Sequence, residues 1–82
     1  MLNPAQIRAA RGLLDWRQED LANASGVGTA TIRRIERSKQ VTGYASTLVR
    51  LQEAFEKAGI LFLDDDDAGG YGLRLAKRKR GR

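Results

Sequence analysis

The sequence predicts a mainly α-helical domain of four helices, followed by a short C-terminal β-hairpin and a basic tail. Apolar residues recur every three or four positions up to residue 58, which is the helical period. After Gly59 a short apolar run and an alternating segment replace that period, as expected for two strands. With 82 residues the chain has room for one core. We therefore divide it into a helical domain (1–59), a hairpin (60–76) and a tail (77–82).

The first helix is predicted to begin at Pro4, a residue that suits the first helical position. Asn3 is a good N-cap, and Gln6 stands three residues later, as in a capping box. Gly12 lowers helix stability by about 1 kcal/mol relative to Ala, which suggests a close helix crossing there. The apolar stripe of this helix consists of Ile7, Ala10, Leu13 and Leu14.

Two further helices, joined by a very short turn, are predicted next. The first begins near Gln18 and ends at Ser25-Gly26, since Gly26 can take the left-handed conformation that ends a helix. The second runs from residue 28 or 29 to about 37. Their predicted inward residues are Leu21, Ala22, Ala24, Val27, Ile32 and Ile35. Two helices joined by about three residues that include glycine have the helix-turn-helix format.

The last helix is predicted after a polar loop, with Ser46 as its cap. Its apolar positions are Leu48, Leu51, Phe55 and Ala58, and Gly59 ends it. Residues 60–63 and 71–75 then form the strands of the hairpin, with a polar loop over 64–70.

Charge is unevenly distributed along the chain. The net charge of +5 divides into +3 for residues 1–63, −3 for 64–76 and +5 for the tail, which we expect to be disordered. A basic balance favours nucleic acid as a partner. The absence of Cys excludes disulfides and Cys-based zinc sites. No catalytic constellation, signal peptide or membrane-spanning run is visible, so we expect a cytoplasmic non-enzyme without cofactor or metal.

The segment 18–36 resembles the Cro/phage-repressor (Xre-type) helix-turn-helix family. The residues at the family's fixed offsets are Gln18, Leu21, Ala22, Gly26, Val27, Ile32, Ile35 and Glu36. The resemblance extends over roughly residues 3–59. It implies a phage-repressor-like fold and a regulator of transcription that binds double-stranded DNA, with two copies on a palindrome. Two positions depart from the family, which usually has Ser or Thr where this chain has Arg17 and Gly28, so both helix starts are expected to be less well capped.

The second helix of such a motif enters the major groove with the residues of its N-terminal half facing the bases. By similarity, Thr29, Ala30 and Arg34 occupy base-reading positions, with Thr31 and Arg33 beside them. Gln18 would bind a phosphate at a helix N-terminus, which favours anions. The other predicted phosphate contacts are Arg17, Arg37, Lys39 and Tyr44.

Three other features are better explained by structure than by ligand binding. Glu36 is expected to connect its helix to the first helix or to a neighbouring Arg, and Trp16 to pack against the last helix. The run Asp64–Asp67 invites comparison with a calcium loop. Counting from Asp64, however, position 12 is Leu75 rather than the Glu that such a loop needs, so a hairpin turn is favoured.

The hairpin is predicted to join two copies of the chain. Ile60, Leu61, Phe62 and Leu63 are apolar on both faces of a strand, and Leu73 lies on the second strand. One face can cover the helices, while the other would be an exposed apolar patch unless it pairs with a copy. The rival hypothesis is a dimer contact formed by the last helix.

The sequence leaves two other functions and one variant of the regulator open. An antitoxin would use the same motif on its own operator and hold a toxin with its C-terminal part. A mobile-element excision factor is a variant of the regulator, since it too would bind and bend DNA. A module that binds only proteins is disfavoured, because Arg33, Arg34 and Arg37 occupy the exposed helix face.

Overall fold

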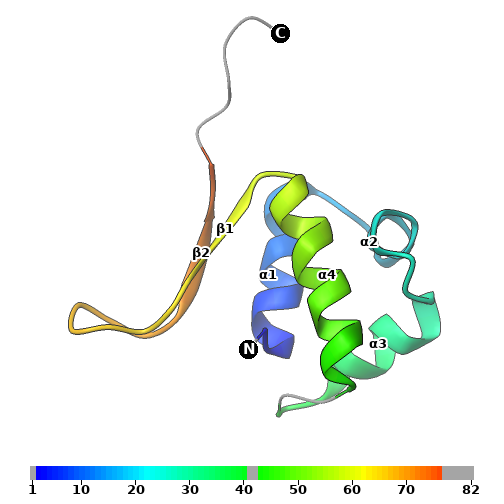
Figure 1. The fold of residues 1–82 in the computed structure, drawn as a ribbon, viewed down its shortest axis with the longest axis horizontal. Coiled ribbons are helices and arrows are strands. Elements are labelled where there is room, and N and C mark those ends of the chain that lie inside the picture. The colour runs from blue at the N-terminus through cyan, green and yellow to red at the C-terminus, as the bar shows by residue number, and fades with distance from the viewer. Residues whose placement is uncertain (1, 41–42, 77–82) are drawn as a thin grey trace, which may run out of the picture.

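The structure is a computed structural model that describes residues 2–40 and 43–76. The predicted tail, residues 77–82, lies outside the described residues. The elements, in chain order, are α1 (Pro4–Leu14), α2 (Gln18–Ser25), α3 (Thr29–Arg37), α4 (Ala45–Lys57), β1 (Ile60–Leu63) and β2 (Gly72–Leu75). The predicted fold class, four helices followed by a C-terminal hairpin, is confirmed (Figure 1).

Local chemistry explains where the helices begin and end. The Asn3 side chain accepts the backbone N–H of Gln6 at 2.9 Å, and the Gln6 side chain accepts that of Asn3 at 3.2 Å. This is the predicted capping box. Gly26 ends α2 with φ 77°, and Gly59 follows α4 with φ 104°, a left-handed region that favours glycine.

The hydrophobic core lies between the four helices and the hairpin. Its buried members come from every helix, from β1, from the residue before the Asn3 cap and from the turn between α2 and α3: Leu2, Ile7, Ala10, Leu21, Val27, Ile32, Ile35, Leu48, Leu51, Ala54, Phe55 and Ile60. Phe55 is fully buried and its ring stacks with that of Trp16 at 5.9 Å between centroids. Trp16 thus packs against α4, as the sequence predicted.

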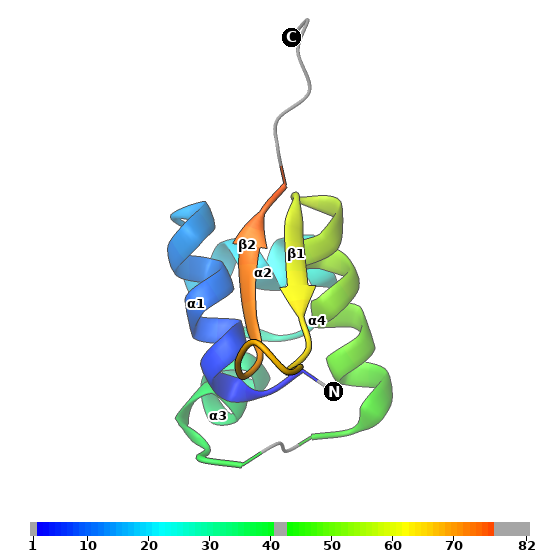
Figure 2. The same ribbon diagram turned by 90° about the vertical axis from the view of Figure 1, so that its left-hand side faces the viewer.

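The hairpin covers the side of the helical body formed by α1 and α4. Strand β2 contacts α1 and strand β1 contacts α4. Helix α3 lies on the far side of that body from the hairpin (Figures 1 and 2). The strands are antiparallel, with Ile60 opposite Leu75 and Phe62 opposite Leu73. These pairs share the inner face of the hairpin.

Three packing predictions were wrong. Leu13 is 46% exposed and Ala24 is also exposed, because each lies just outside the stripe that its helix turns toward the core. Gly12 does not mark a close helix crossing, since it is exposed and a Cβ there would meet nothing within 4 Å.

The predicted start of the last helix was also wrong. Ser46 does not cap α4; the N-cap is Tyr44, whose side chain makes no capping bond. The helix begins at Ala45 because the Tyr44 carbonyl already accepts the backbone N–H groups of Thr47 at 3.0 Å and Leu48 at 3.1 Å.

Candidate nucleic-acid interface

A turn of three residues, Gly26–Gly28, connects α2 and α3. Gly26 reverses the chain in the left-handed conformation, and Val27 is buried with only 7% exposure. The Ser25 hydroxyl supports the turn by donating to the Leu21 carbonyl at 2.7 Å and accepting the Val27 N–H at 3.1 Å. The buried Val27 side chain therefore fixes the direction of α3 relative to α2.

Helix α3 has one buried and one exposed face. Ile32, Ile35 and Glu36 are buried, whereas four residues on the opposite side are exposed: Ala30, Arg33, Arg34 and Arg37. Thr29 and Thr31 lie at the edges of this exposed stripe and are half-buried. Within residues 2–40 and 43–76, no ion pair involves the three arginines. Their guanidinium donors are therefore available to an outside acceptor.

A buried polar network holds α3 against α1. Arg11 donates from Nε and Nη2 to the two carboxylate oxygens of Glu36, each at 2.7 Å, and Glu36 is only 5% exposed. These hydrogen bonds and the negative charge of Glu36 raise the pKa of the Arg11 guanidinium, although burial lowers it. The prediction that Glu36 connects its helix to the first helix is confirmed.

The start of α2 belongs to the same network. The Gln18 side-chain amide donates to Glu36 Oε1 at 3.2 Å, and Arg11 Nη1 donates to the Trp16 carbonyl at 3.0 Å. An amide nitrogen carries two hydrogens, so Gln18 keeps one donor free. The N-terminus of α2 and the stripe on α3 are thereby held in a fixed mutual position.

The N-cap positions show the consequence of the two departures from the family. Neither Arg17 nor Gly28 makes a side-chain capping bond. At α2 only the other half of a capping box is present, in which the Asp20 carboxylate accepts the Arg17 backbone N–H at 2.8 Å. The Arg17 guanidinium lies 3.4 Å from Glu19 and 3.6 Å from Asp20 and is 76% exposed, so both pairs are weak.

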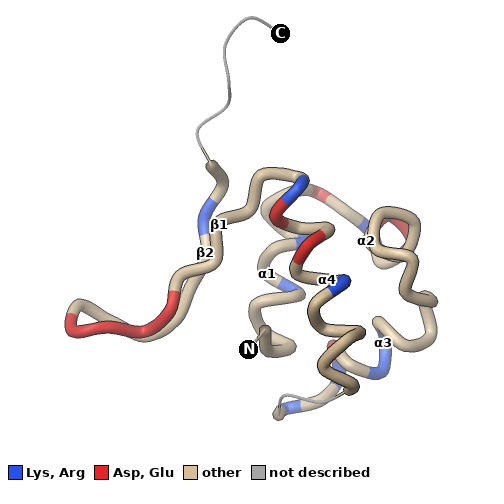
Figure 3. Tube along the Cα trace, in the orientation of Figure 1, with Lys and Arg blue, Asp and Glu red and all other residues tan. Residues whose placement is uncertain are grey.

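The α3 end of the molecule and the projecting loop of the hairpin carry opposite charge, although acidic residues also lie on α2 and α4 and basic residues on α1, α4 and β2 (Figure 3). Exposed arginines lie on α3, and exposed Lys39 and the 81% exposed Tyr44 follow it. Acidic residues Asp64–Asp67 occupy the loop that projects from the hairpin. The exposed arginines of α3 therefore form a basic stripe that suits a polyanion.

The family model described as helix-turn-helix matches residues 7–58. The chain belongs to the Xre/Cro-like helix-turn-helix family of DNA-binding regulators. No curated protein matches the chain. The match begins within α1, covers the other three helices of this helix-turn-helix protein and ends before the hairpin. Among the described residues, no helix has the length and apolarity to cross a membrane.

In this helix-turn-helix protein three predicted base readers, Ala30, Arg33 and Arg34, share the exposed face of α3, and Thr29 and Thr31 lie at its two edges. The predicted phosphate contacts come from two places. Arg17 and Gln18 lie at the start of α2, whereas Arg37, Lys39 and Tyr44 follow α3. Sequence reasoning gave no role to Arg8, which lines a hollow together with Arg37 and Lys39. The feature of the sequence that could have identified Arg8 is its position three residues before Arg11, which places both arginines on one side of α1.

Proposed function

We propose that this protein is a sequence-specific regulator that acts as a dimeric repressor and places α3 in the major groove of a palindromic operator. The observation that carries the proposal is the exposed stripe of three arginines on the second helix of the motif, none of which forms an ion pair within the described part of the chain. A cytoplasmic, nucleoid-associated location follows from this function, because the protein works where the DNA is.

The predicted readers fit the chemistry of base edges. Arg34 supplies two parallel donors for guanine O6 and N7, and the methyl groups of Ala30 and Thr29 suit a thymine methyl. Thr31 and Arg33 flank them. Helix α3 is nine residues long, about 13 Å, while the groove is about 12 Å wide. With its N-terminal half in the groove, its C-terminal end reaches the phosphate wall.

The proposed phosphate anchors hold α3 in register. Gln18 has one free amide hydrogen at the N-terminus of α2, where the helix dipole favours an anion. Arg17 is exposed beside it, and Arg37, Lys39 and Tyr44 are exposed at the other end of α3. Contacts on both sides of the groove would fix the orientation of α3 without reading sequence.

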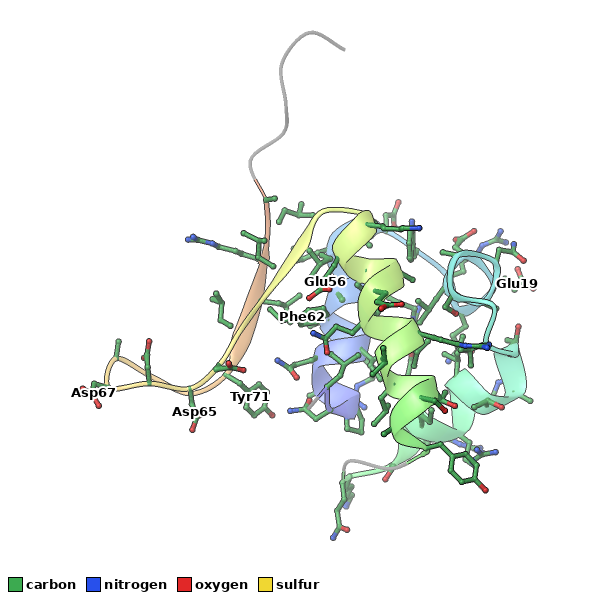
Figure 4. All side chains as sticks on the ribbon, viewed as in Figure 1. Glu19, Glu56, Phe62, Asp65, Asp67 and Tyr71 are labelled. Carbon is green, nitrogen blue, oxygen red and sulfur yellow. The ribbon has the colours of Figure 1, made fainter. Side chains whose placement is uncertain are left out.

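The outer face of the hairpin is the proposed contact between two copies. Leu61 is 43% exposed and Leu63 is 42% exposed on this face. Ile60, Phe62 and Leu73 instead pack against the protein's own helices, and the Phe62 ring meets that of Phe55 at 6.0 Å (Figure 4). The proposed interface therefore narrows to Leu61 and Leu63, and it leaves α3 of both copies free.

Fluorescence anisotropy with DNA duplexes tests the proposal. Binding to a duplex obtained by selection should weaken by orders of magnitude between about 50 and 200 mM salt, because several phosphates per subunit are neutralised. An unrelated duplex of equal length should bind far more weakly at every salt concentration. Equal, weak binding to both duplexes would refute a sequence-specific regulator.

A further inference from the structure

A hollow outside the helix-turn-helix brings three distant segments together. Its lining comes from the first two turns of α1, including Arg8, from Arg37 to Lys39 at the end of α3, and from Tyr71 on the hairpin. Figure 4 shows Tyr71 at the base of the projecting loop, on the side of the N-terminal end of α1. Tyr71 is 55% exposed.

The hollow has an uncompensated positive charge. Arg8, Arg37 and Lys39 line it, and none of its lining residues is acidic. Arg8 donates from Nη1 to the backbone carbonyl of Glu36, which orients its guanidinium without neutralising it. The Glu36 carboxylate is bonded on both oxygens by Arg11. A charge of this kind attracts an anion.

The polar groups around the hollow also favour an anion as its ligand. Asn3 and Ser38 use their side chains within their own turns, on Gln6 and Gln40 respectively. The Tyr71 hydroxyl, in contrast, makes no hydrogen bond within residues 2–40 and 43–76 and remains a free donor. The hollow therefore offers an anion three cationic side chains and one neutral O–H, from segments up to 63 positions apart, Arg8 to Tyr71.

The hollow continues the DNA-reading stripe. Arg37 follows Arg34 by one helical turn on the exposed face of α3, so the stripe runs directly into the hollow. A duplex that receives the N-terminal half of α3 in its groove carries a row of phosphates at the C-terminal end of that helix. We propose that this hollow binds a phosphodiester of the DNA backbone and that Arg8 and Tyr71 contact it. The inference rests on the proposed function.

Arg8→Ala and Tyr71→Phe test the two new contacts in anisotropy titrations over a range of salt. Loss of Arg8 should reduce the slope of log K against log salt by about 0.9, equally on preferred and unrelated duplexes. Tyr71→Phe removes no charge, so it should leave the slope unchanged and weaken binding by up to about tenfold. Arg8→Lys should restore most of the slope. Circular dichroism reports on folding.

Arg50→Ala is the matched control, since it removes the same charge from an exposed position on α4 that does not line the hollow. An unchanged slope in folded Arg8→Ala, with wild-type binding still specific, would overturn this inference and leave the proposed function standing. Failure of the wild type to bind any duplex would instead refute the proposed function. A titration with inorganic phosphate, followed by NMR, separates the sources. Suppose that inorganic phosphate changes the NMR chemical shifts of residues at the hollow, while Arg8→Ala leaves the slope of log K against log salt for DNA unchanged. That result would indicate a site for a free anion and contradict the proposal.

Discussion

Helix α3 and the outer face of the hairpin both present exposed groups, but of opposite chemistry. On α3 these groups are arginines that form no ion pair within residues 2–40 and 43–76, and on the hairpin they are Leu61 and Leu63, which are 43% and 42% exposed. A charged surface in water is stable alone, whereas exposed leucines in a cluster favour association. The two faces therefore differ in the partner that they suit, and under our proposal these partners are DNA for α3 and a second copy for the hairpin.

The largest effect is expected where α3 is held in place. Glu36→Ala removes a buried carboxylate and leaves the Arg11 guanidinium, 20% exposed, and the Gln18 amide without their acceptor. We expect a loss of about 3 kcal/mol in the free energy of unfolding, measured by urea denaturation. Glu53→Ala, an exposed carboxylate on α4, should change it by less than about 0.5 kcal/mol. Similar losses in both variants would show that the network does not hold α3.

Disruption of the exposed leucines on the outer face of the hairpin should affect assembly and not folding. Leu61→Asp introduces a charge at a 43% exposed position of the hairpin, so it should weaken dimerisation at least tenfold in analytical ultracentrifugation, about 1.4 kcal/mol. Val49→Asp is the matched control at a 49% exposed position of α4, the rival interface. Dissociation by the Val49 variant alone would move the contact to α4.

Substitution of an arginine on the exposed face of α3 should change the sequence preference of DNA binding. Arg34→Ala should lose about 1–3 kcal/mol on the preferred duplex and relax the preference at one base position of each half-site. Lys57→Ala, which removes a charge from the last turn of α4, should alter neither quantity. Equal losses on all duplexes would make Arg34 an anchor and not a reader.

The smallest effect is expected at the start of α2. Gln18→Ala should weaken binding by about 1 kcal/mol on every duplex, because a phosphate contact carries no sequence information. Titration of the preferred and the unrelated duplex with this variant measures the ratio of the two affinities. A change in that ratio would assign Gln18 to the base readers.

Sequence reasoning predicted the helical part of the fold well, because each element there carries a local signal. The Asn3–Gln6 box, Gly26 and Gly59 mark helix ends, and the spacing of Ile32 and Ile35 orients α3. The prediction that Ser46 caps α4 was wrong because the Tyr44 carbonyl already accepts the first helical hydrogen bonds, so Ser46 lies inside the helix.

The remaining features depend on packing between distant segments. Because β1 is apolar on both faces, its sequence left open which face covers the core, whereas in the structure Ile60 and Phe62 pack against the helices. The hollow at Arg8 joins α1, the end of α3 and Tyr71, and no spacing along the chain predicts that meeting.

Selection of binding sites from random duplexes, with wild-type protein and with Arg34→Ala in parallel, tests whether α3 reads the DNA sequence. We predict an inverted repeat whose half-site centres lie one helical turn apart, about 34 Å, or a multiple of it. In the Arg34→Ala selection, the preference should disappear at the same single position of both half-sites. A wild-type selection that yields no preferred sequence, or one that Arg34→Ala leaves unchanged, would contradict the assignment of α3 as the reading helix.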